Sequence, residues 1–334
     1  MRCFRRLATG SYTDMLVFIN KSISYYRLTL TNCSTEEFTC IDGRCVSLDE
    51  RCDGKTDCGD RSDEEDCNAF VTFNGYNKLF APPPTENETT LSIQTSIDID
   101  EIIDIDENEG FFTAKFTIIR KWRNSQLTYQ NLKRNPIKNK LSTNDFGRMW
   151  KPYVIFQNIR HRDDYKKTDV LDVLTIIPNQ EFNFELSDRT QFRNTRLFKG
   201  DKNIIDYQRQ YTVRWVCNFA MHWYPFDNQI CTMEILESDP FITLIPSSVT
   251  YSGPMELTQH IVKEVAICSV AAKKRTGVVV QVSFGRPLFG TTLSVFMPTT
   301  ILLLLSQMVR VFGHNHLEMV IEVNLTLILV LATL

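Results

Sequence analysis

The sequence predicts a mainly β, extracellular protein whose carboxyl-terminal part forms apolar helices. Three observations predict this class: apolar and polar residues alternate in short stretches through 91–286, six cysteines crowd between Cys33 and Cys67, and a mostly apolar run fills 288–312. Alternation with a period of two is typical of half-buried strands, and a long series of such strands with few helices favours a β-sandwich. The apolar run is long enough to cross the core of a bilayer as a helix.

Length, charge and cysteine content narrow the class of protein. The 334 residues leave room for more than one domain. A formal net charge of −3 gives no electrostatic footprint for nucleic acid, which we exclude as a partner. Ten cysteines indicate an oxidising compartment, and glycan-acceptor triplets at Asn20, Asn32 and Asn87 agree with an extracellular location.

Composition separates the amino-terminal residues 1–32 and a linker from the folded parts of the chain. Residues 1–32 show no clear period apart from a strand expected over 16–19, and we assign them no function. They lack the apolar segment of an export signal, and the last apolar segment stops at Leu334, so we expect a fragment of a longer protein. Three consecutive prolines at 82–84 favour an extended spacer, which predicts a linker over 68–90.

The six-cysteine block over 33–67 is the first folded module that we expect. Its cysteines are separated by six, four, six, five and eight residues, and acidic side chains fill its last third. A segment this short with few large apolar residues cannot build a core, so disulfides or a metal must hold it. Spacing alone leaves the pairing open, whereas hard oxygen ligands converging from a short loop suit calcium.

With the segments CDGKTDC and DRSDEEDC, this spacing resembles a low-density-lipoprotein receptor class A module. The resemblance implies a structural calcium ion and three disulfides. The implied pairs are Cys33–Cys45, Cys40–Cys58 and Cys52–Cys67. The implied ligands are the side chains of Asp53, Asp57, Asp63 and Glu64 and the backbone carbonyls of Glu50 and Lys55. Glu50 stands where such modules usually carry tryptophan, a change that leaves a carbonyl ligand in place.

The segment CNFAMHWYPFDNQIC is the most informative part of the chain, since Cys217 and Cys231 enclose thirteen residues that include Tyr-Pro-Phe-Asp. Together with the apolar run that follows, it resembles a Cys-loop receptor, a pentameric ligand-gated ion channel. The resemblance extends over IDIDEN and MWKPYVIFQN, and it implies a ligand-binding β-sandwich over 91–286 and a membrane region over 287–334. It also implies a Cys217–Cys231 disulfide, and closing such a loop stabilises a fold by roughly 3 kcal/mol.

The same resemblance implies how the loop acts in gating. Pro225 fixes a backbone angle inside it, and the loop rests on the pore domain, where it passes agonist binding on to the gate. Asp227 follows Pro225 and Phe226, and Arg286 stands just before the first span. The resemblance implies that these two form an ion pair at the junction of the domains. Removing one partner of a buried pair costs several kcal/mol, which suits a switch.

The resemblance places a small-molecule agonist between neighbouring sandwiches. The residues at or near the implied site are Thr117, Phe156, Gln157, Ser238, Asp239 and Phe241. Amine transmitters are usually held by a cage of aromatic faces, and most of these positions are not aromatic. We therefore expect no conventional amine box, and the agonist stays unidentified. The basic run at 273–275 is either a contact for an anionic agonist or a solvated loop tip. We expect Cys268, in the strand before this loop, to be a buried thiol.

Two apolar stretches, 288–312 and 319–334, are the first two of the four spans that the resemblance implies. Alignment puts Leu329 in the central leucine ring of the pore, with Thr326 on the same helix face. Glu318 and Glu322 lie near the inner mouth. Carboxylates at membrane depth need to face water or a partner, and a ring of them favours cations.

The leading hypothesis is a subunit of a pentameric ligand-gated channel in the plasma membrane, with several spans and an extracellular amino-terminal part. Other subunits, membrane lipid and an agonist are the expected partners. The alternative is a membrane-anchored adhesion or uptake receptor that binds through the calcium module. A membrane-anchored serine protease is excluded, because there is no Gly-Asp-Ser-Gly segment and the five histidines stand in no triad-like context. We expect no enzymatic activity.

Overall fold

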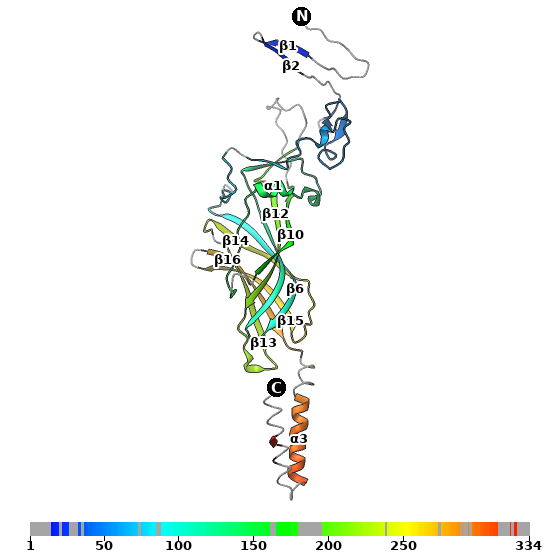
Figure 1. The fold of residues 1–334 in the computed structure, drawn as a ribbon. Coiled ribbons are helices and arrows are strands. Elements are labelled where there is room, and N and C mark those ends of the chain that lie inside the picture. Colours follow the sequence, from blue (N-terminus) through cyan, green and yellow to red (C-terminus); the bar gives the residue numbers. More distant parts are fainter. Residues whose placement is uncertain are drawn as a thin grey trace.

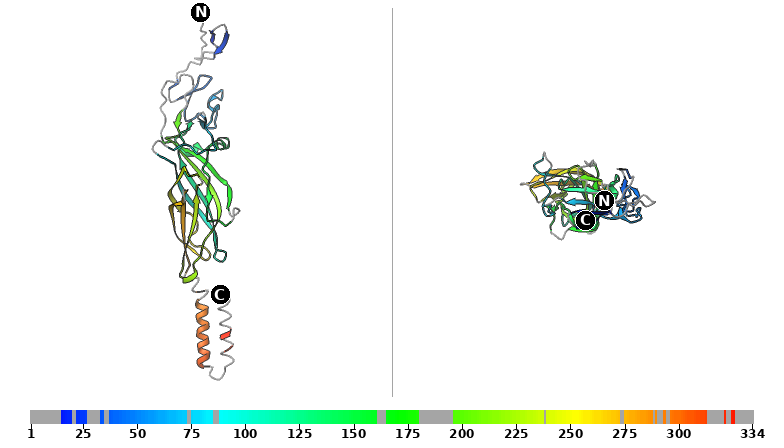
Figure 2. Two further views of the ribbon diagram at one scale, coloured as in Figure 1. Left: turned by 90° about the vertical axis from the view of Figure 1, so that its left-hand side faces the viewer. Right: turned by 90° about the horizontal axis from the view of Figure 1, so that it is seen from above.

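A computed structural model describes most of the chain. The described residues are 15–19, 22–26, 33–34, 37–72, 75–84, 88–160, 165–179, 196–237, 239–272, 275–287, 289, 293, 296–312, 321 and 324–325. The molecule is elongated, with a small amino-terminal hairpin and a disulfide-rich module at one end, a β-sandwich in the middle and helix α3 (Met297–Phe312) at the other end (Figures 1 and 2). Strands β1 (Met15–Ile19) and β2 (Ser22–Tyr26) form the hairpin.

The disulfide-rich module contains little regular structure. Strands β3 (Glu37–Thr39) and β4 (Cys45–Ser47) pair, and a single 3-10 turn, η1, covers Ser62–Glu64. The buried apolar cluster has only five members, which are Phe38, Cys40, Val46, Leu48 and Cys58. A core of this size cannot hold a module alone, and three disulfides join the same cysteine pairs that the resemblance implied.

The first sheet of the sandwich has five strands in the order β10 (Tyr165–Ile177), β12 (Ile204–Val216), β7 (Phe111–Trp122), β6 (Leu91–Asp106) and β14 (Ile242–Tyr251). Neighbours are antiparallel except β14, which runs parallel to β6. Alternate residues of β7 face the core, so Phe112, Phe116 and Ile118 are fully buried.

The second sheet has the order β15 (Ile261–Ala272), β16 (Arg275–Gly285), β13 (Asn228–Leu236) and β9 (Ile155–Phe156). The two sheets bury one continuous apolar core, in which Phe156 packs against Phe116 and Trp215. The predicted mainly β fold is therefore confirmed. The expectation for Cys268 was wrong: its thiol is free and exposed, because β15 is an edge strand and this residue lies on the solvent side.

A third, three-stranded sheet lies at the module end of the sandwich. It has the order β11 (Leu197–Lys199), β8 (Leu127–Gln130) and β5 (Phe70–Thr72). Strand β5 falls within the stretch that composition assigned to the linker, and Phe70 is buried in the core of the sandwich. The 3-10 turn η2 (Pro136–Asn139) and helix α1 (Thr143–Arg148) follow β8.

The helical segments lie beyond the opposite end of the sandwich (Figure 1). Ser306 Oγ of α3 donates to Asn324 Oδ1 at 3.0 Å, so Asn324 lies beside α3. No helix within the described ranges is both long enough and apolar enough to span a membrane. The predicted pore residues Glu318, Glu322, Thr326 and Leu329, and the glycan-acceptor residues Asn20, Asn32 and Asn87, lie outside the described residues.

Candidate functional site

Three charged side chains meet at the end of the sandwich that is nearest to α3. Arg286 donates from Nε to Asp227 Oδ1 at 2.8 Å and from Nη2 to Glu107 Oε1 at 2.5 Å. The side chains of Arg286 and Asp227 are only 6% and 2% exposed. Removing one partner from such a shielded pair leaves a charge without compensation, so the cluster is sensitive to single changes.

Strand register brings the three residues together. Asn228 at the start of β13 pairs with Gly285 at the end of β16, so Asp227 and Arg286 are the next residues along two neighbouring strands. Glu107 follows the last residue of β6, in the facing sheet. We name Glu107, Asp227 and Arg286 the junction cluster, because it joins both sheets where the chain leaves the sandwich.

The surroundings keep Asp227 and Arg286 ionised. Burial alone would raise the pKa of Asp227, but hydrogen bonds from Arg286 and Gln229 lower the pKa of this carboxyl below its ordinary value. Burial likewise opposes the charge of Arg286, yet its hydrogen bonds to Asp227 and Glu107 raise the pKa of the guanidinium. The ion pair is therefore the stable form at neutral pH.

Sequence reasoning missed two members of this site. Glu107 lies in the IDIDEN segment, whose sequence indicates a strand but no ion-pair partner. The buried His260 places Nε2 2.7 Å from Glu107 Oε1, and it was considered only as a catalytic residue. Glu107 and His260 both lie far from Asp227 in the sequence, so only the strand register brings them next to the pair of Asp227 and Arg286.

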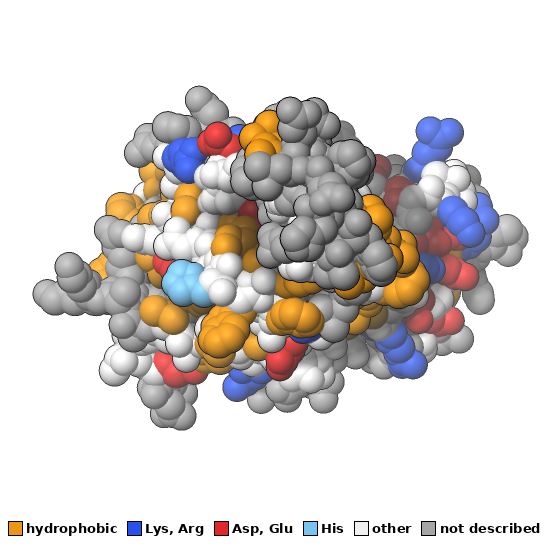
Figure 3. Space-filling view, turned by 90° about the horizontal axis from the view of Figure 1, so that it is seen from below, with side chains coloured by type: hydrophobic (Ala, Val, Ile, Leu, Met, Phe, Trp, Pro, Cys, Tyr) orange, Lys and Arg blue, Asp and Glu red, His pale blue; other side chains and the backbone are white. Residues whose placement is uncertain are grey.

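The loop closed by the Cys217–Cys231 disulfide projects from the same end of the sandwich. Gln229 braces its base, because its side chain accepts from Ala220 N at 2.8 Å and donates to Ala220 O at 2.9 Å. Its tip includes the 3-10 turn η4 (Met221–Trp223) and carries apolar side chains in solvent, with Trp223 79% exposed. Figure 3, viewed from this end, shows hydrophobic side chains gathered on the face. The loop thus presents an apolar tip on a braced base.

The predicted agonist residues occupy different environments. Thr117 and Phe156 are buried, and Phe156 belongs to the aromatic core. Gln157 and Phe241 are exposed, and the backbone N–H of Phe241 donates to Asp239 Oδ1 at 2.9 Å. Ser238 and residues 273–274 of the basic loop tip lie outside the described residues. The described residues therefore do not form a single pocket wall.

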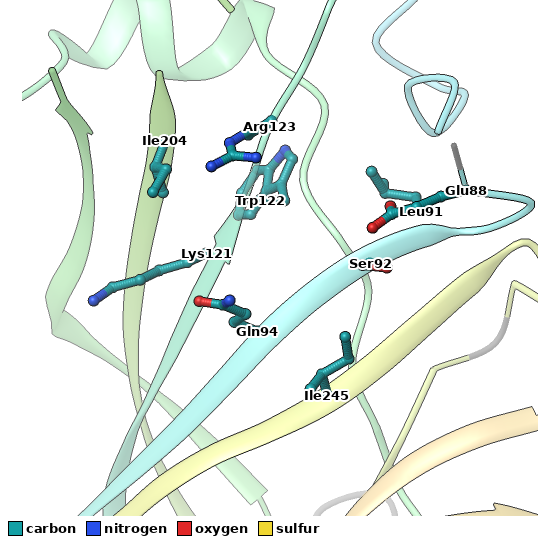
Figure 4. A pocket seen from close by; sticks show the side chains of 9 residues that line it. All are labelled: Glu88, Leu91, Ser92, Gln94, Lys121, Trp122, Arg123, Ile204 and Ile245. Carbon is teal, nitrogen blue, oxygen red and sulfur yellow. The ribbon is translucent and has the colours of Figure 1, made fainter. Parts of the chain in front are cut away.

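A hollow of about 170 Å³ opens at the outer surface of the first sheet (Figure 4). Side chains of β6, β7, β12 and β14 surround it, including Gln94, Lys121, Trp122 and Ile245. None of the six predicted agonist residues lines this hollow. It is a second candidate location for a small molecule on the sandwich.

The carboxylates of the acidic loop in the small module accept hydrogen bonds from backbone N–H groups of the same loop. Asp63 is fully buried, and its Oδ2 accepts from Asp57 N at 2.7 Å. Glu64 Oε1 accepts from Asp53 N at 2.9 Å, and Asp53 Oδ1 accepts from Lys55 N at 2.9 Å. Within the described ranges, no group of three or more His, Cys, Asp or Glu side chains is arranged to hold a metal ion.

One carboxylate oxygen of the acidic loop is nevertheless suited to bind a cation. The Oδ1 of Asp63 is buried and has no hydrogen-bond partner. A buried carboxylate oxygen without a donor is costly, and a hard cation such as calcium would satisfy it. The donor set is made of oxygens only, which is the chemistry that calcium prefers.

The module is docked on the sandwich by a lysine. Lys133, between β8 and η2, is 8% exposed, and its Nζ donates to the carbonyl oxygens of Asp49 at 2.8 Å and Arg51 at 2.6 Å. Arg196 adds an ion pair from Nη1 to Asp49 Oδ1 at 2.8 Å. Burial lowers the pKa of the Lys133 ammonium, although nearby carboxylates of Asp49 and Asp53 oppose this shift. The docking contacts flank Glu50, a backbone ligand in the implied calcium set.

Comparison with known families agrees with this geometry. The model of the neurotransmitter-gated ion-channel ligand binding domain matches residues 70–238, about half of the chain. The chain belongs to this channel family. The matched region begins at β5, which explains why Phe70 packs in the core of the sandwich although composition assigned it to a linker.

A second family model, the low-density lipoprotein receptor domain class A, matches residues 31–67. The suspected combination of a channel ligand-binding domain with this module is therefore confirmed. Relatives match through the module: the atrial natriuretic peptide-converting enzyme of Rattus norvegicus is 57% identical over 35 residues, which is 10% of this chain and 3% of that protein. Low-density lipoprotein receptor-related protein 10 of Homo sapiens is 54% identical over 37 residues, or 11% of this chain and 5% of that protein. The channel chain thus spans only a small part of the length of these relatives.

Proposed function

We propose that the chain is a subunit of a pentameric ligand-gated ion channel of the plasma membrane. The junction cluster carries this proposal. It ties the loop of Cys217–Cys231, both sheets and the residue at which the chain leaves the sandwich into one buried ion-pair network. A small-molecule agonist would bind between the sandwiches of neighbouring subunits.

In this mechanism the agonist shifts an equilibrium between closed and open states. Movement of one sheet against the other changes the distance between Glu107 of the first sheet and Arg286 of the second. Because Arg286 precedes the apolar run 288–312, which contains α3, that movement would be passed to this run. The apolar side chains Trp223 and Phe226 at the loop tip supply a second contact with the membrane domain.

The membrane part of the proposal rests on the apolar runs 288–312 and 319–334. They would cross the bilayer as the first two spans, with the second lining the pore. Glu318 and Glu322 would favour cations, Leu329 would form the closed constriction, and Thr326 would share its face. A reversal potential that follows the sodium gradient is expected, whereas one that follows chloride would contradict cation selectivity.

We further propose that calcium stabilises the small module. Asp53, Asp57, Asp63 and Glu64, with the carbonyls of Glu50 and Lys55, would hold the ion, and the unpartnered oxygen of Asp63 supports this assignment. The ion would supply charge compensation to the acidic loop and no chemistry. Asn20, Asn32 and Asn87 are the proposed glycan sites on the extracellular side.

A current recording of the full-length protein tests the channel function. An agonist found by screening small molecules should evoke currents in cells that express the wild-type protein, and Asp227→Asn should abolish them while surface expression persists. Glu109→Gln is the matched control, because it breaks an exposed ion pair with Arg160 in the same region. Currents of wild-type size from Asp227→Asn would refute the coupling role.

A further inference from the structure

A second group of cations lies inside the sandwich, apart from the junction cluster. A cavity of about 160 Å³ is lined by Arg120, Lys151 and Arg209, with the rings of Tyr207 and Tyr211 beside them. Three of these residues come from β12, one from β7, and Lys151 from the segment before β9. All of the lining residues come from a single chain.

The strand register explains why the charges converge. Arg120 of β7 pairs with Tyr207 of β12, and Arg209 lies two residues further along the same strand. Residues two apart in a strand share a face, so Tyr207, Arg209 and Tyr211 all point to the side that Arg120 occupies. Arg120 in turn shares its face with the core residue Ile118.

These arginines are not fully satisfied. Arg120 is 3% exposed and donates from Nη1 to the carbonyl oxygen of Pro152 at 2.7 Å, but its buried Nε has no hydrogen-bond partner. The buried Nε of Arg209 also lacks one. Burial lowers the pKa of the Arg120 guanidinium, which reflects the cost of a buried charge. Unpaired buried donors on two arginines in one cavity leave room for a bidentate acceptor.

The charged residues around the cavity also favour an anionic ligand. Arg209 pairs with Asp172 at 3.5 Å, and Glu237 raises the pKa of Arg120 through its charge. No carboxylate is among the described residues that line the cavity, whereas three cations are. Lys151 is the third cation: its Nζ lies 3.5 Å from the ring centre of Phe146, and no carboxylate in the described ranges lies within 4 Å of it. Asp172 acts on both Arg209 and Lys151 through its charge, so one carboxylate near the cavity is shared between two of its cations.

We propose that this cavity binds a small carboxylic acid in its ionised form. The carboxylate would accept hydrogen bonds from Arg120 and Arg209, Lys151 would balance its charge, and the apolar remainder would rest on Tyr207 and Tyr211. The volume admits a molecule of a few heavy atoms. Because the ligand would hold β7, β12 and the segment before β9 together, it would stabilise the sandwich as its concentration rises.

Thermal unfolding of the purified full-length chain in sodium propionate tests the proposal. We expect the unfolding temperature of the sandwich to rise and saturate with propionate, beyond the effect of sodium chloride at equal ionic strength. Propionamide, which has the same shape without the charge, should cause no saturable rise. An equal rise with propionamide, or no saturable rise with propionate, would overturn the proposal.

Variants then locate the site. Lys151→Gln removes a cation from a partly exposed residue and should weaken the apparent affinity for propionate about tenfold, the scale of one charge-assisted contact. Arg209→Gln should weaken the affinity for propionate as well. This variant provides the test if Lys151→Gln folds poorly. Lys138→Gln, an exposed lysine of η2 outside the cavity, should leave the affinity unchanged. Equal affinity in the wild type, Lys151→Gln and Arg209→Gln would contradict the assignment.

Discussion

Arg286 holds two carboxylates that reach it from opposite sheets, and this arrangement defines the site at the scale of single residues. The sequence indicated the pair of Asp227 and Arg286 through a family resemblance. It gave no sign of Glu107 or His260, because their proximity depends on where β6 ends and β15 begins relative to the end of β16. Residues that follow a motif could be named in advance, whereas residues that complete the network across sheets could not.

The lowered pKa of Asp227 gives a prediction of pH dependence. A carboxyl whose folded pKa lies below its unfolded value stabilises the fold above the unfolded value, and this contribution is lost as pH falls through the folded pKa. The difference in unfolding free energy between the wild type and Asp227→Asn should be constant from neutral pH down to about 5, then shrink below about 4. Urea unfolding of both proteins across this range measures it.

The other carboxyls contribute equally to the unfolding free energies of the wild type and Asp227→Asn, so their contributions cancel in the difference. A difference that grows as the pH falls would show that the ionised form of Asp227 is not the stabilised one. Glu109→Gln, whose ion pair is exposed, provides the control and should change the unfolding free energy little.

At the scale of elements, the sequence did not predict the contact between the module and the sandwich. Composition predicted a free linker over 68–90, because three prolines favour extended chain. The structure instead places β5 in a sheet with β8, and Lys133 reaches the module from the loop after β8. A lone lysine in a loop carries no signal of docking in the sequence, since its acceptors are backbone carbonyls that any residues provide.

Replacing Lys133 by methionine should loosen this contact. The substitution keeps most of the length of the side chain but removes the ammonium that binds the carbonyls of Asp49 and Arg51. Hydrogen exchange measured by mass spectrometry should become faster in residues 48–51, with the core of the sandwich unchanged. Lys138→Met, on an exposed lysine of η2, should leave exchange in the module unaltered. Unchanged exchange in Lys133→Met would show that other contacts hold the module.

At the scale of the whole molecule, the module followed by the ligand-binding sandwich was predicted from the sequence. Cysteine spacing identified the module and period-two alternation identified the sandwich, because both patterns are imposed by local geometry. The topology was not accessible in this way: the parallel pairing of β14 with β6 joins segments that are distant in the chain. The sequence also left the agonist unidentified, and the described residues do not gather the predicted agonist positions.

Calcium removal should affect one end of the molecule more than the other. Chelation with EGTA should speed hydrogen exchange in residues 52–67, because the acidic loop would lose charge compensation, while the three disulfides keep the module connected. Calcium at about 100 times its dissociation constant would stabilise the module by roughly 2.7 kcal/mol. Asp63→Asn should reproduce the effect of EGTA, and Glu37→Gln, outside the acidic loop, should not. Equal exchange with calcium and with EGTA would contradict the metal assignment.

The most direct test of the account is a charge exchange across the junction, recorded as ligand-evoked current from the full-length protein. Asp227→Arg and Arg286→Asp should each abolish the current at normal surface expression, and the double variant should restore part of it, because the exchanged charges attract again. Wild-type currents from both single variants, or a double variant no better than either one at equal surface expression, would contradict transmission through this ion pair.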